Sequence, residues 1–251
     1  MATVLSRVEG SVGLIELNRP RARNAIDAEL AAEFVAALRA LQSEVAAIVV
    51  TGRDPAFCAG LDLRNLGSER LGQVPKCAAE VRAATVPVIG AINGPAVTAG
   101  LEIALACDIL IASERASFAD THLDVRVYPG PVLVDLPRRV GRSWARLMSL
   151  TGDFVDAATA LRIGLADRVV AHDEVVPAAL ATAARIAGHD PAMVAAMRHE
   201  WDELEPLDIG AAHARHIENA RRLGFRGTTA RHLASTGARL LARHREPGQD
   251  A

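Results

Sequence analysis

The chain has 251 residues, half of them hydrophobic, and a formal net charge of -2 at pH 7. This length suits one large domain, or one domain with a helical appendage. A net charge so close to zero gives no general attraction to nucleic acid or to acidic membrane surfaces, so neither is expected as a partner. Because only 3% of the residues are aromatic, the core has to be built from alanine, valine, leucine and isoleucine.

Three cysteines are present, none of them in a CxxC pair: Cys58, Cys77 and Cys107. Their odd number argues against a disulfide framework and favours a reducing, cytoplasmic setting. The first ten residues lack a basic region followed by an apolar run, so no signal peptide is expected. The uncharged run 83–101 is interrupted by proline, asparagine and glycine, which is typical of a core strand and turn rather than of a membrane span.

In chain order, the N-terminal pattern predicts a hairpin of two strands, Val4–Val8 and Val12–Leu17. Asp27 is expected to start a helix, because apolar residues follow it at helical spacing: Leu30, Phe34, Leu38 and Leu41. Three short, buried strands are expected next: Ala46–Thr51, Val86–Ile92 and Asp108–Ala112. Strands separated by helices indicate an α/β fold with mostly parallel pairing and helices on the outside.

After Pro137 the pattern becomes mainly helical. The expected helices cover 143–150, 156–163, 174–187, 191–204 and a long stretch from 207 to 244. The end of that stretch mixes arginine and histidine with leucine and alanine, which is more typical of a solvated or subunit-facing helix than of a nucleic-acid surface.

Glu102 is the residue with the clearest chemical signal. Between Val86 and Ala112 only Glu102 and Asp108 carry a charge, and Glu102 lies where the pattern changes from strand to helix. Burial raises the pKa of a carboxyl group, and the N–H groups at a helix N-terminus can hold a developing oxyanion. Together they suit proton transfer next to a carbonyl carbon. The alternative is helix capping, but Thr98 and Glu102 are four residues apart and a capping box needs three.

Two turns of small residues, 56–63 and 94–100, follow two of the predicted strands. If those strands are neighbours, both turns open at the sheet edge where ligands bind in open α/β folds. Small residues there let backbone N–H groups approach a ligand closely. Neither turn contains GxGxxG or GxxxxGK[ST], so a phosphate loop is not indicated.

The sequence resembles the crotonase superfamily of enoyl-CoA hydratases and isomerases. The similar segments are LNRPRARNAID at 17–27, VVTGRDPAFCAGLDL at 49–63, VIGAINGPAVTAGLEIALACDILIAS at 88–113, SFADTHLDVRVYPG at 117–130 and LTGDFVDAATALRIGLADRVV at 150–170. They follow the order of the family and cover nearly the whole chain.

The resemblance implies a spiral of repeated ββα turns over residues 1–190, followed by a helical region, 191–251, that mediates oligomerisation as a trimer or a dimer of trimers. It also implies an acyl-CoA substrate. Coenzyme A is then part of the substrate, and no separate cofactor or metal is expected.

By position, the resemblance assigns the oxyanion hole for a thioester carbonyl to the N–H groups of Leu61 and Ala99. The family usually has glycine at the second position. The methyl group of Ala99 leaves the N–H available, but it restricts φ and narrows the pocket.

The strip formed by Arg21, Ala22 and Arg23 resembles the family's CoA-binding edge, with Ala59 and Asp62 beside the adenine region. Arginine side chains pair well with phosphates. The alternative for the two arginines is an ordinary solvated turn.

Glu102 corresponds to the first catalytic glutamate of the hydratases, and His122 stands where the second is expected. An imidazole titrates in the range useful for acid–base catalysis. The alternatives are that His122 is a buried, neutral structural residue, or that Asp124 supplies the second carboxylate. Tyr128 is expected to line the acyl tunnel.

Two further interpretations of this segment are weaker. Asp120, His122 and Asp124 alternate and would share one face of an extended chain, but a single nitrogen ligand makes a poor metal site. A nucleophilic triad with Ser117 lacks the strained turn that such a serine requires.

Three functions stay open on these grounds. The first is an enoyl-CoA hydratase working through an enolate, with Glu102 as the main acid–base group. The second is an isomerase, or another crotonase-type lyase or hydrolase, because one carboxylate is enough to move a proton between C2 and C4. The third is a weakly catalytic acyl-CoA-binding protein, against which the intact Glu102 counts.

Overall fold

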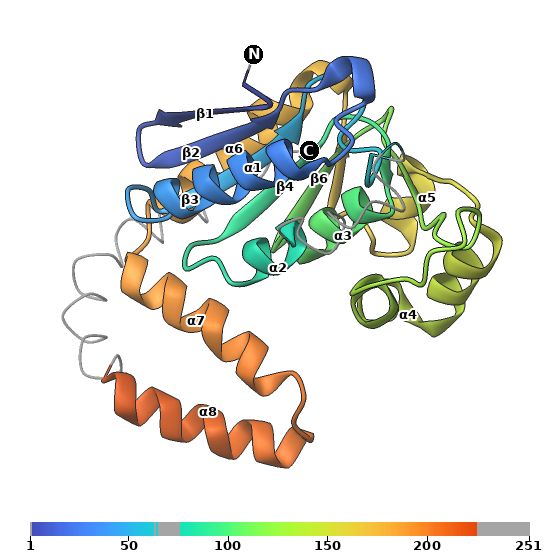
Figure 1. The fold of residues 1–251 in the computed structure, drawn as a ribbon. Coiled ribbons are helices and arrows are strands. Elements are labelled where there is room, and N and C mark those ends of the chain that lie inside the picture. Colours follow the sequence, from blue (N-terminus) through green and yellow to red (C-terminus); the bar gives the residue numbers. More distant parts are fainter. Residues whose placement is uncertain (1, 63, 65–75, 225–251) are drawn as a thin grey trace. The chain divides into compact units, whose positions relative to one another are not determined.

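The computed structural model describes residues 2–62, 64 and 76–224 (Figure 1). The chain divides into two compact units, residues 1–191 and 192–251. The first unit contains both β-sheets and the helices that pack on them. The assembly role predicted for the C-terminal region stays a prediction.

A six-stranded sheet forms the centre of the first unit, in the order β1-β2-β3-β4-β6-β9. The predicted hairpin is confirmed as an antiparallel β1–β2 pair, and the remaining neighbours pair in parallel. The strands are β1 (Val4–Glu9), β2 (Val12–Leu17), β3 (Ala47–Gly52), β4 (Val88–Ile92), β6 (Ile109–Ser113) and β9 (Arg168–Val170).

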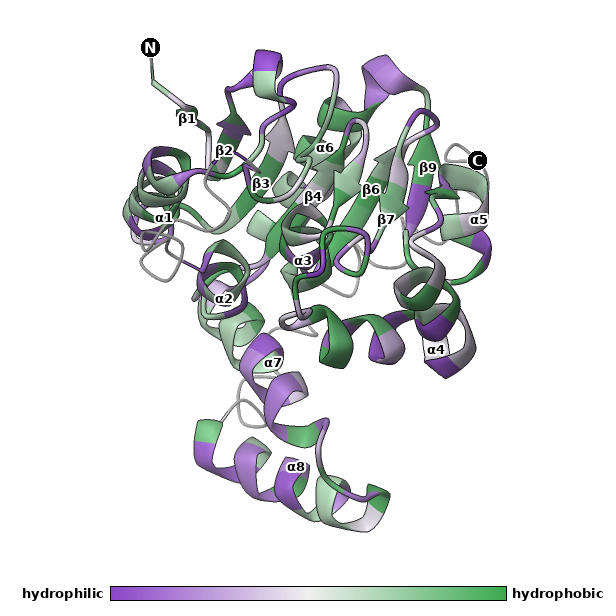
Figure 2. Cartoon of the chain, turned by 45° about the vertical axis from the view of Figure 1, so that its right-hand side comes forward, coloured by the Kyte–Doolittle hydropathy of each residue, from purple (hydrophilic) through white to green (hydrophobic). Residues whose placement is uncertain are grey.

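The central strands are apolar on both faces because helices cover both faces (Figure 2). Alternate residues of β3 point to opposite sides. Ile48 and Val50 join the core beneath helices α1 to α3, whereas Ala47 and Val49 pack with α6. These helices are α1 (Ala28–Leu41), α2 (Cys77–Arg82), α3 (Ala99–Ala106) and α6 (Val175–Ala187). The predicted α1 begins at its expected cap, since Asp27 accepts a hydrogen bond from the Leu30 N–H.

A second, three-stranded sheet was not predicted, because its strands are only two or three residues long. It contains β5 (Ala96–Val97), β7 (Ser117–Ala119) and β8 (Val155–Asp156). Strands β5 and β7 are parallel, with Val97 opposite Ala119. This pairing brings the turn before α3 next to the segment that carries His122.

The helical second half departs from the prediction at two places. Helix α4 (Val132–Thr151) begins before Pro137 rather than after it, and its two segments meet at Gly141, where φ is 77°. Helix α8 (Ile209–Leu223) ends at Gly224 in the left-handed conformation. The rest of the predicted 207–244 stretch lies outside the described residues. The other helices are η1 (Pro20–Ala22), α5 (Ala157–Arg162), η4 (His172–Glu174) and α7 (Pro191–Leu204).

In the second unit, polar side chains join α7 to α8. Glu203 of α7 accepts a hydrogen bond of 2.8 Å from Asn219 and forms an ion pair with Arg215. His216 lies 3.1 Å from Glu200.

The turns after β3 and β4 pack so closely that two glycines lie at their contact. A Cβ on Gly100 would lie 2.2 Å from the Cys58 carbonyl oxygen, and one on Gly60 would lie 2.0 Å from Thr98 Oγ1. Gly60 also has a φ of 92°, which side-chain-bearing residues rarely adopt. Only glycine fits at these two positions without pushing the turns apart.

We therefore expect Gly100→Ala to lower the free energy of unfolding by about 1–3 kcal/mol, the range for overpacking a filled site. Urea denaturation monitored by circular dichroism measures this loss. Gly188→Ala is the matched control, because its Cβ would lie 3.4 Å from the nearest atom and its φ is ordinary. Equal stability of the Gly100→Ala variant and the wild type would contradict the close docking of the two turns.

Candidate active site

Two backbone N–H groups on these turns, those of Leu61 and Ala99, have no hydrogen-bond partner among the described residues. The N–H of Ile26 donates to Gly60 and the N–H of Asp62 donates to Ile26, at 2.7 and 2.9 Å. These bonds bracket Leu61, so its own N–H points away from Ile26. Ala99 is the first residue of α3, where N–H groups have no partner within the helix. Within the described residues, neither the Leu61 N–H nor the Ala99 N–H donates a hydrogen bond.

The strained residue of this turn is Thr98, and not Ala99. Thr98 has a φ of 46°, while Ala99 is not among the residues with positive φ. The Thr98 N–H donates to the Ala119 carbonyl at 3.0 Å, and its own carbonyl accepts from Glu102 at 2.9 Å. These bonds hold a conformation that costs about 1–3 kcal/mol elsewhere. The alanine that replaces the family's glycine therefore carries no left-handed strain.

Glu102 lies on the first turn of α3 with its carboxylate partly buried. Its Oε1 lies 3.5 Å from the Val132 nitrogen, and a Cβ on Gly130 would come within 3.0 Å of the same oxygen. Burial raises the pKa of this carboxyl, an effect that the nearby charge of His122 partly offsets. Helix α3 has no side-chain cap, and the Glu102 carboxylate faces the start of α4, so the capping alternative has no support.

His122 lies just beyond β7 and is only 8% exposed. Its Nδ1 is 2.5 Å from Oδ1 of Asp120. This hydrogen bond raises the pKa of the His122 imidazole, and the charges of Asp120 and Glu102 act in the same direction against the effect of burial. The charges of His122 and Glu102 act on each other's pKa, so the two side chains lie near one another, and a joint role for them stays a prediction.

Asp124 and Tyr128 are exposed in the protomer. Tyr128 is 87% exposed, and the Asp124 carboxylate lies against Gly152 after α4. The chain after His122 does not stay extended, because the Asp124 N–H donates to Thr121 and the Val127 N–H to His122. Asp124 forms no hydrogen bond or ion pair with Glu102 or His122 in the described part of the chain. Their place in the acyl pocket stays a prediction.

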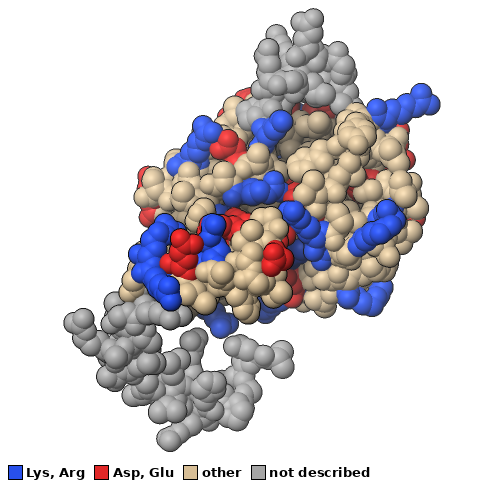
Figure 3. Space-filling view, turned by 90° about the horizontal axis from the view of Figure 1, so that it is seen from below, with Lys and Arg blue, Asp and Glu red and all other residues tan. Residues whose placement is uncertain are grey.

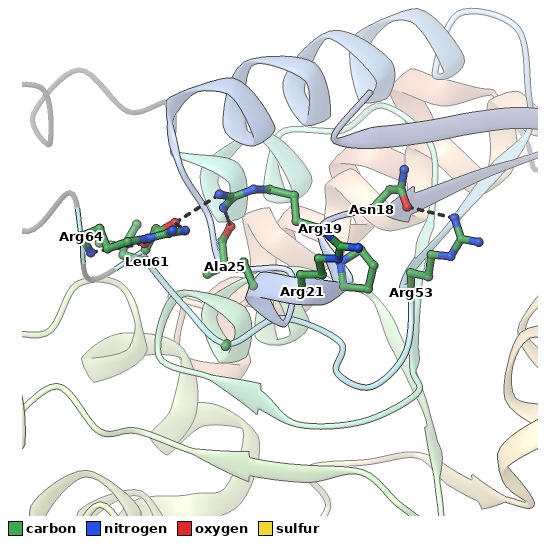
Figure 4. Close-up of a pocket in the computed structure, with 11 residues that line it drawn as sticks. Asn18, Arg19, Arg21, Ala25, Arg53, Leu61 and Arg64 are labelled. Carbon is green, nitrogen blue, oxygen red and sulfur yellow. Dashed lines mark hydrogen bonds and ion pairs between the residues drawn. The ribbon is translucent and has the colours of Figure 1, made fainter. Parts of the chain in front are cut away.

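A cleft of about 920 Å³ opens beside Leu61 (Figure 4). Four of the five residues predicted for CoA binding line it: Arg21, Ala22, Ala59 and Asp62. Arg23 does not line the cleft; it fixes the cleft's backbone instead, because its carbonyl accepts a hydrogen bond from the Ala59 N–H. The sequence reasoning missed six lining residues: Asn18, Arg19, Pro20, Ala25, Arg53 and Arg64.

Asp62 organises the arginines of this cleft. Arg64 contacts both carboxylate oxygens, at 2.9 and 2.7 Å, and Arg19 contacts Oδ2 at 3.2 Å. The hydrogen bonds from Arg64 hold the pKa of the Asp62 carboxyl far below its ordinary value. Arg19 also pairs with Asp27 at 2.8 Å. By contrast, Arg21 forms no ion pair with any described residue, so its charge is available to a ligand.

Asn24 fastens this edge to the turn after β3 and was also missed. It is fully buried with a φ of 56°. Its amide nitrogen donates to the carbonyls of Arg53 and Ala56, and its oxygen accepts from the Arg19 N–H. Asparagine is enriched at positive φ. The asparagine at position 24 was therefore the sequence signal that could have indicated a tight turn here.

Outside the cleft, a charged patch, a metal-ligand cluster or a membrane-spanning helix among the described residues would indicate a further function. Acidic and basic side chains are interspersed on the face shown in Figure 3. Residues 2–62, 64 and 76–224 contain no group of three side chains suited to a metal ion. No helix in the same residues is long and apolar enough to cross a membrane.

The turns after β3 and β4 thus each carry a backbone N–H with no partner among the described residues, and the partly buried Glu102 carboxylate lies on the first turn of α3. The sequence model of the enoyl-CoA hydratase/isomerase family matches residues 7–217, and the chain belongs to this family. The predicted superfamily and α/β fold class are thereby confirmed.

Curated relatives cover most of the chain. A probable enoyl-CoA hydratase of Rhizobium meliloti is 41% identical over 74% of this chain and 75% of its own. The mitochondrial enoyl-CoA hydratase of Pongo abelii is 36% identical over 76% and 68%. A probable peroxisomal enoyl-CoA hydratase of Arabidopsis thaliana is 34% identical over 86% and 84%.

Solved structures agree with these relatives. The enoyl-CoA hydratase of Mycobacterium smegmatis is 46% identical, with a TM-score of 0.74 over 88% of this chain and 97% of its own. The Pseudomonas aeruginosa protein DspI is 30% identical, with a TM-score of 0.85 over 95% of each chain.

Proposed function

We propose that this protein is an enzyme that adds water to 2-enoyl-CoA thioesters through an enolate intermediate. The observation that carries the proposal is the partly buried Glu102 carboxylate, on the first turn of the helix whose leading N–H, that of Ala99, is free. Membership of the enoyl-CoA hydratase/isomerase family supports it. No separate cofactor is needed, because coenzyme A is part of the substrate.

The cleft beside Leu61 suits the nucleotide end of the substrate. Arg21 and Arg53 line it and can pair with phosphates, while Ala22 and Ala59 leave room for the adenine. Arg19 and Arg64 are held by Asp62 and mainly shape the wall. Because Leu61 lies on the same cleft, the pantetheine arm leads from it to the two free N–H groups.

The thioester carbonyl accepts hydrogen bonds from the Leu61 and Ala99 N–H groups. When water attacks C3, the electron pair of the double bond moves toward this carbonyl, and the two N–H groups stabilise the enolate oxygen. The Glu102 carboxylate takes the proton from the attacking water. The His122 imidazolium gives a proton to C2. Glu102 then releases its proton to solvent and His122 takes one up from solvent, which restores both groups.

The pKa shifts of the two groups suit Glu102 as the base and His122 as the acid. Burial raises the pKa of Glu102, so it is a stronger base than an ordinary carboxylate once ionised. The hydrogen bond to Asp120 raises the pKa of His122, so the imidazole stays protonated to higher pH. The rate should therefore be highest between the two pKa values, and fall as Glu102 protonates below and as His122 deprotonates above.

A double-bond isomerase is the second candidate. The observation that favours it is His122 itself, because the family's pair of carboxylates around a water molecule is missing. Glu102 alone could carry a proton between C2 and C4. The relatives named above include peroxisomal and mitochondrial enzymes. We propose a cytoplasmic location for this protein, because its three cysteines do not suit a disulfide framework.

Glu102→Gln should reduce turnover by about two to four orders of magnitude, the usual effect of removing a general acid–base group. The assay follows the enoyl thioester absorbance of crotonyl-CoA, with product analysis to separate hydration from isomerisation. Binding of the thioester, measured by calorimetry, should be unchanged. Glu114→Gln, an exposed glutamate on the turn after β6, is the matched control. A variant that keeps more than a tenth of the wild-type rate excludes Glu102, and wild-type binding without turnover favours the acyl-CoA-binding alternative.

Arg21→Ala should raise KM for the acyl-CoA roughly tenfold or more and leave kcat unchanged, because the arginine contacts a part of the substrate that does not react. Steady-state kinetics with crotonyl-CoA measure this split. Arg7→Ala, which removes an exposed arginine paired with Glu9 on the β1–β2 hairpin, is the control. An unchanged KM would remove Arg21 from the binding site.

We also propose assembly as a trimer or a dimer of trimers. Exposed apolar side chains around the end of α4, including Leu150 and Phe154, support burial between subunits. Leu223 is described and partly exposed; the other C-terminal side chains expected at the interface (Phe225, Leu233, Leu240 and Leu241) lie outside the described residues. Sedimentation velocity at micromolar concentration should give a trimer or hexamer, and a stable monomer would contradict the proposal.

A further inference from the structure

Asp120 is a buried carboxylate in contact with His122. It is 1% exposed and lies directly after β7, where its Oδ1 is 2.5 Å from His122 Nδ1. Its Oδ2 is buried and accepts no hydrogen bond from any described residue. A buried charge is costly unless it is compensated, and hydrogen bonds from His122 and Ser149 compensate this one.

A carboxylate that accepts a hydrogen bond from one ring nitrogen of a histidine determines the protonation of the second ring nitrogen. Asp120 accepts from Nδ1, so the neutral imidazole carries its hydrogen on Nδ1, and Nε2 is the nitrogen left for other chemistry. Nε2 of His122 makes no hydrogen bond within the described residues. The ring can then exchange a proton only through Nε2.

The pair is attached to the oxyanion turn by backbone bonds. Ala119, the residue before Asp120, lies opposite Val97 and accepts a hydrogen bond from Thr98, the residue before Ala99. The strand that carries Asp120 therefore holds a fixed position relative to the oxyanion donor. Glu102 lies three residues after Ala99, on the first turn of α3.

The surrounding charged and polar groups shift the pKa values of Asp120, His122 and Glu102. Burial opposes the charge on Asp120, but the hydrogen bond from His122 and the Ser149 hydroxyl of α4 hold the pKa of Asp120 below its ordinary value. Glu102 and Asp120 both raise the pKa of His122. Asp135 of α4 acts on Glu102 and raises its pKa.

We propose that Asp120 is a positioning residue for this site: through Nδ1 it fixes the orientation and tautomer of His122, so that Nε2 is presented to C2 of the substrate as the proton donor. The proposal rests on the proposed function, which makes His122 the acid. Neither the sequence nor the resemblance to the family assigns this role to Asp120.

The first test does not depend on turnover. Nitrogen-15 NMR of the histidine rings in the full chain, with His122 assigned from His122→Gln, reports tautomer and pKa. The wild type should show the Nδ1–H tautomer and a pKa above the ordinary value of 6.5. In Asp120→Asn the pKa should fall and the Nε2–H tautomer should dominate. A wild-type ring in the Nε2–H form, or an unmoved pKa in the variant, overturns the proposal.

The second test is kinetic. Asp120→Asn should lower kcat for crotonyl-CoA by roughly ten- to a hundredfold, the usual scale for removing a group that orients a catalytic residue, with KM unchanged. The alkaline limb of the pH–rate profile should move to lower pH, because His122 loses the charge that kept it protonated. Asp173→Asn, an exposed aspartate on η4, is the control.

A double-mutant cycle separates positioning from a general structural effect. In the His122→Gln background, Asp120→Asn should cause no further loss, whereas an equal loss in both backgrounds overturns the proposal. If the wild type does not hydrate enoyl thioesters, the proposed function fails, while the ring titration still reports whether Asp120 controls His122.

Discussion

The site depends on the close docking of two turns that follow neighbouring parallel strands. Gly100 meets the Cys58 carbonyl, and Gly60 meets Thr98, with no room for a side chain at either contact. The Gly100 contact is with a backbone carbonyl and the Gly60 contact is with the Thr98 hydroxyl, so the packing of the two turns sets the distance between the Leu61 and Ala99 N–H groups. This explains why an alanine at position 99 is acceptable: the left-handed φ belongs to Thr98, and the N–H of Ala99 is unaffected.

An imidazole in place of a second carboxylate changes the electrostatics of the site. Two neighbouring carboxylates raise each other's pKa, and their acid and base roles are separated only by environment. Here the partner of Glu102 has the opposite charge when protonated, so it lowers the pKa of Glu102 while Glu102 raises that of His122. Each group thereby favours the charged form of the other, so the base and the acid that we propose differ in residue type.

Local patterns were sufficient to predict the hairpin, the parallel strands, both turns and the place of Glu102 at the start of a helix, because each depends on residues close in sequence. Contacts distant in sequence were not predictable in this way. Arg53 and Arg64 reach the cleft from the two ends of the turn after β3, and only the folded chain brings them to Arg19. The alternation of Asp120, His122 and Asp124 predicted one shared face. It failed at Asp124, because the chain turns at Thr121 and separates Asp124 from the other two.

The turn after β3 links substrate binding to chemistry. Ala59 and Asp62 line the cleft, while Leu61, between them, carries the N–H that we propose as an oxyanion donor. Arg19 and Arg64 form ion pairs with Asp62, and these pairs hold the turn in place before a ligand binds. A nucleotide bound in the cleft would contact this same turn, and contacts with a remote part of a substrate can be used to fix the geometry at its reacting centre. A CoA thioester would then be processed faster than a truncated thioester with the same acyl group, because the truncated one leaves the cleft empty.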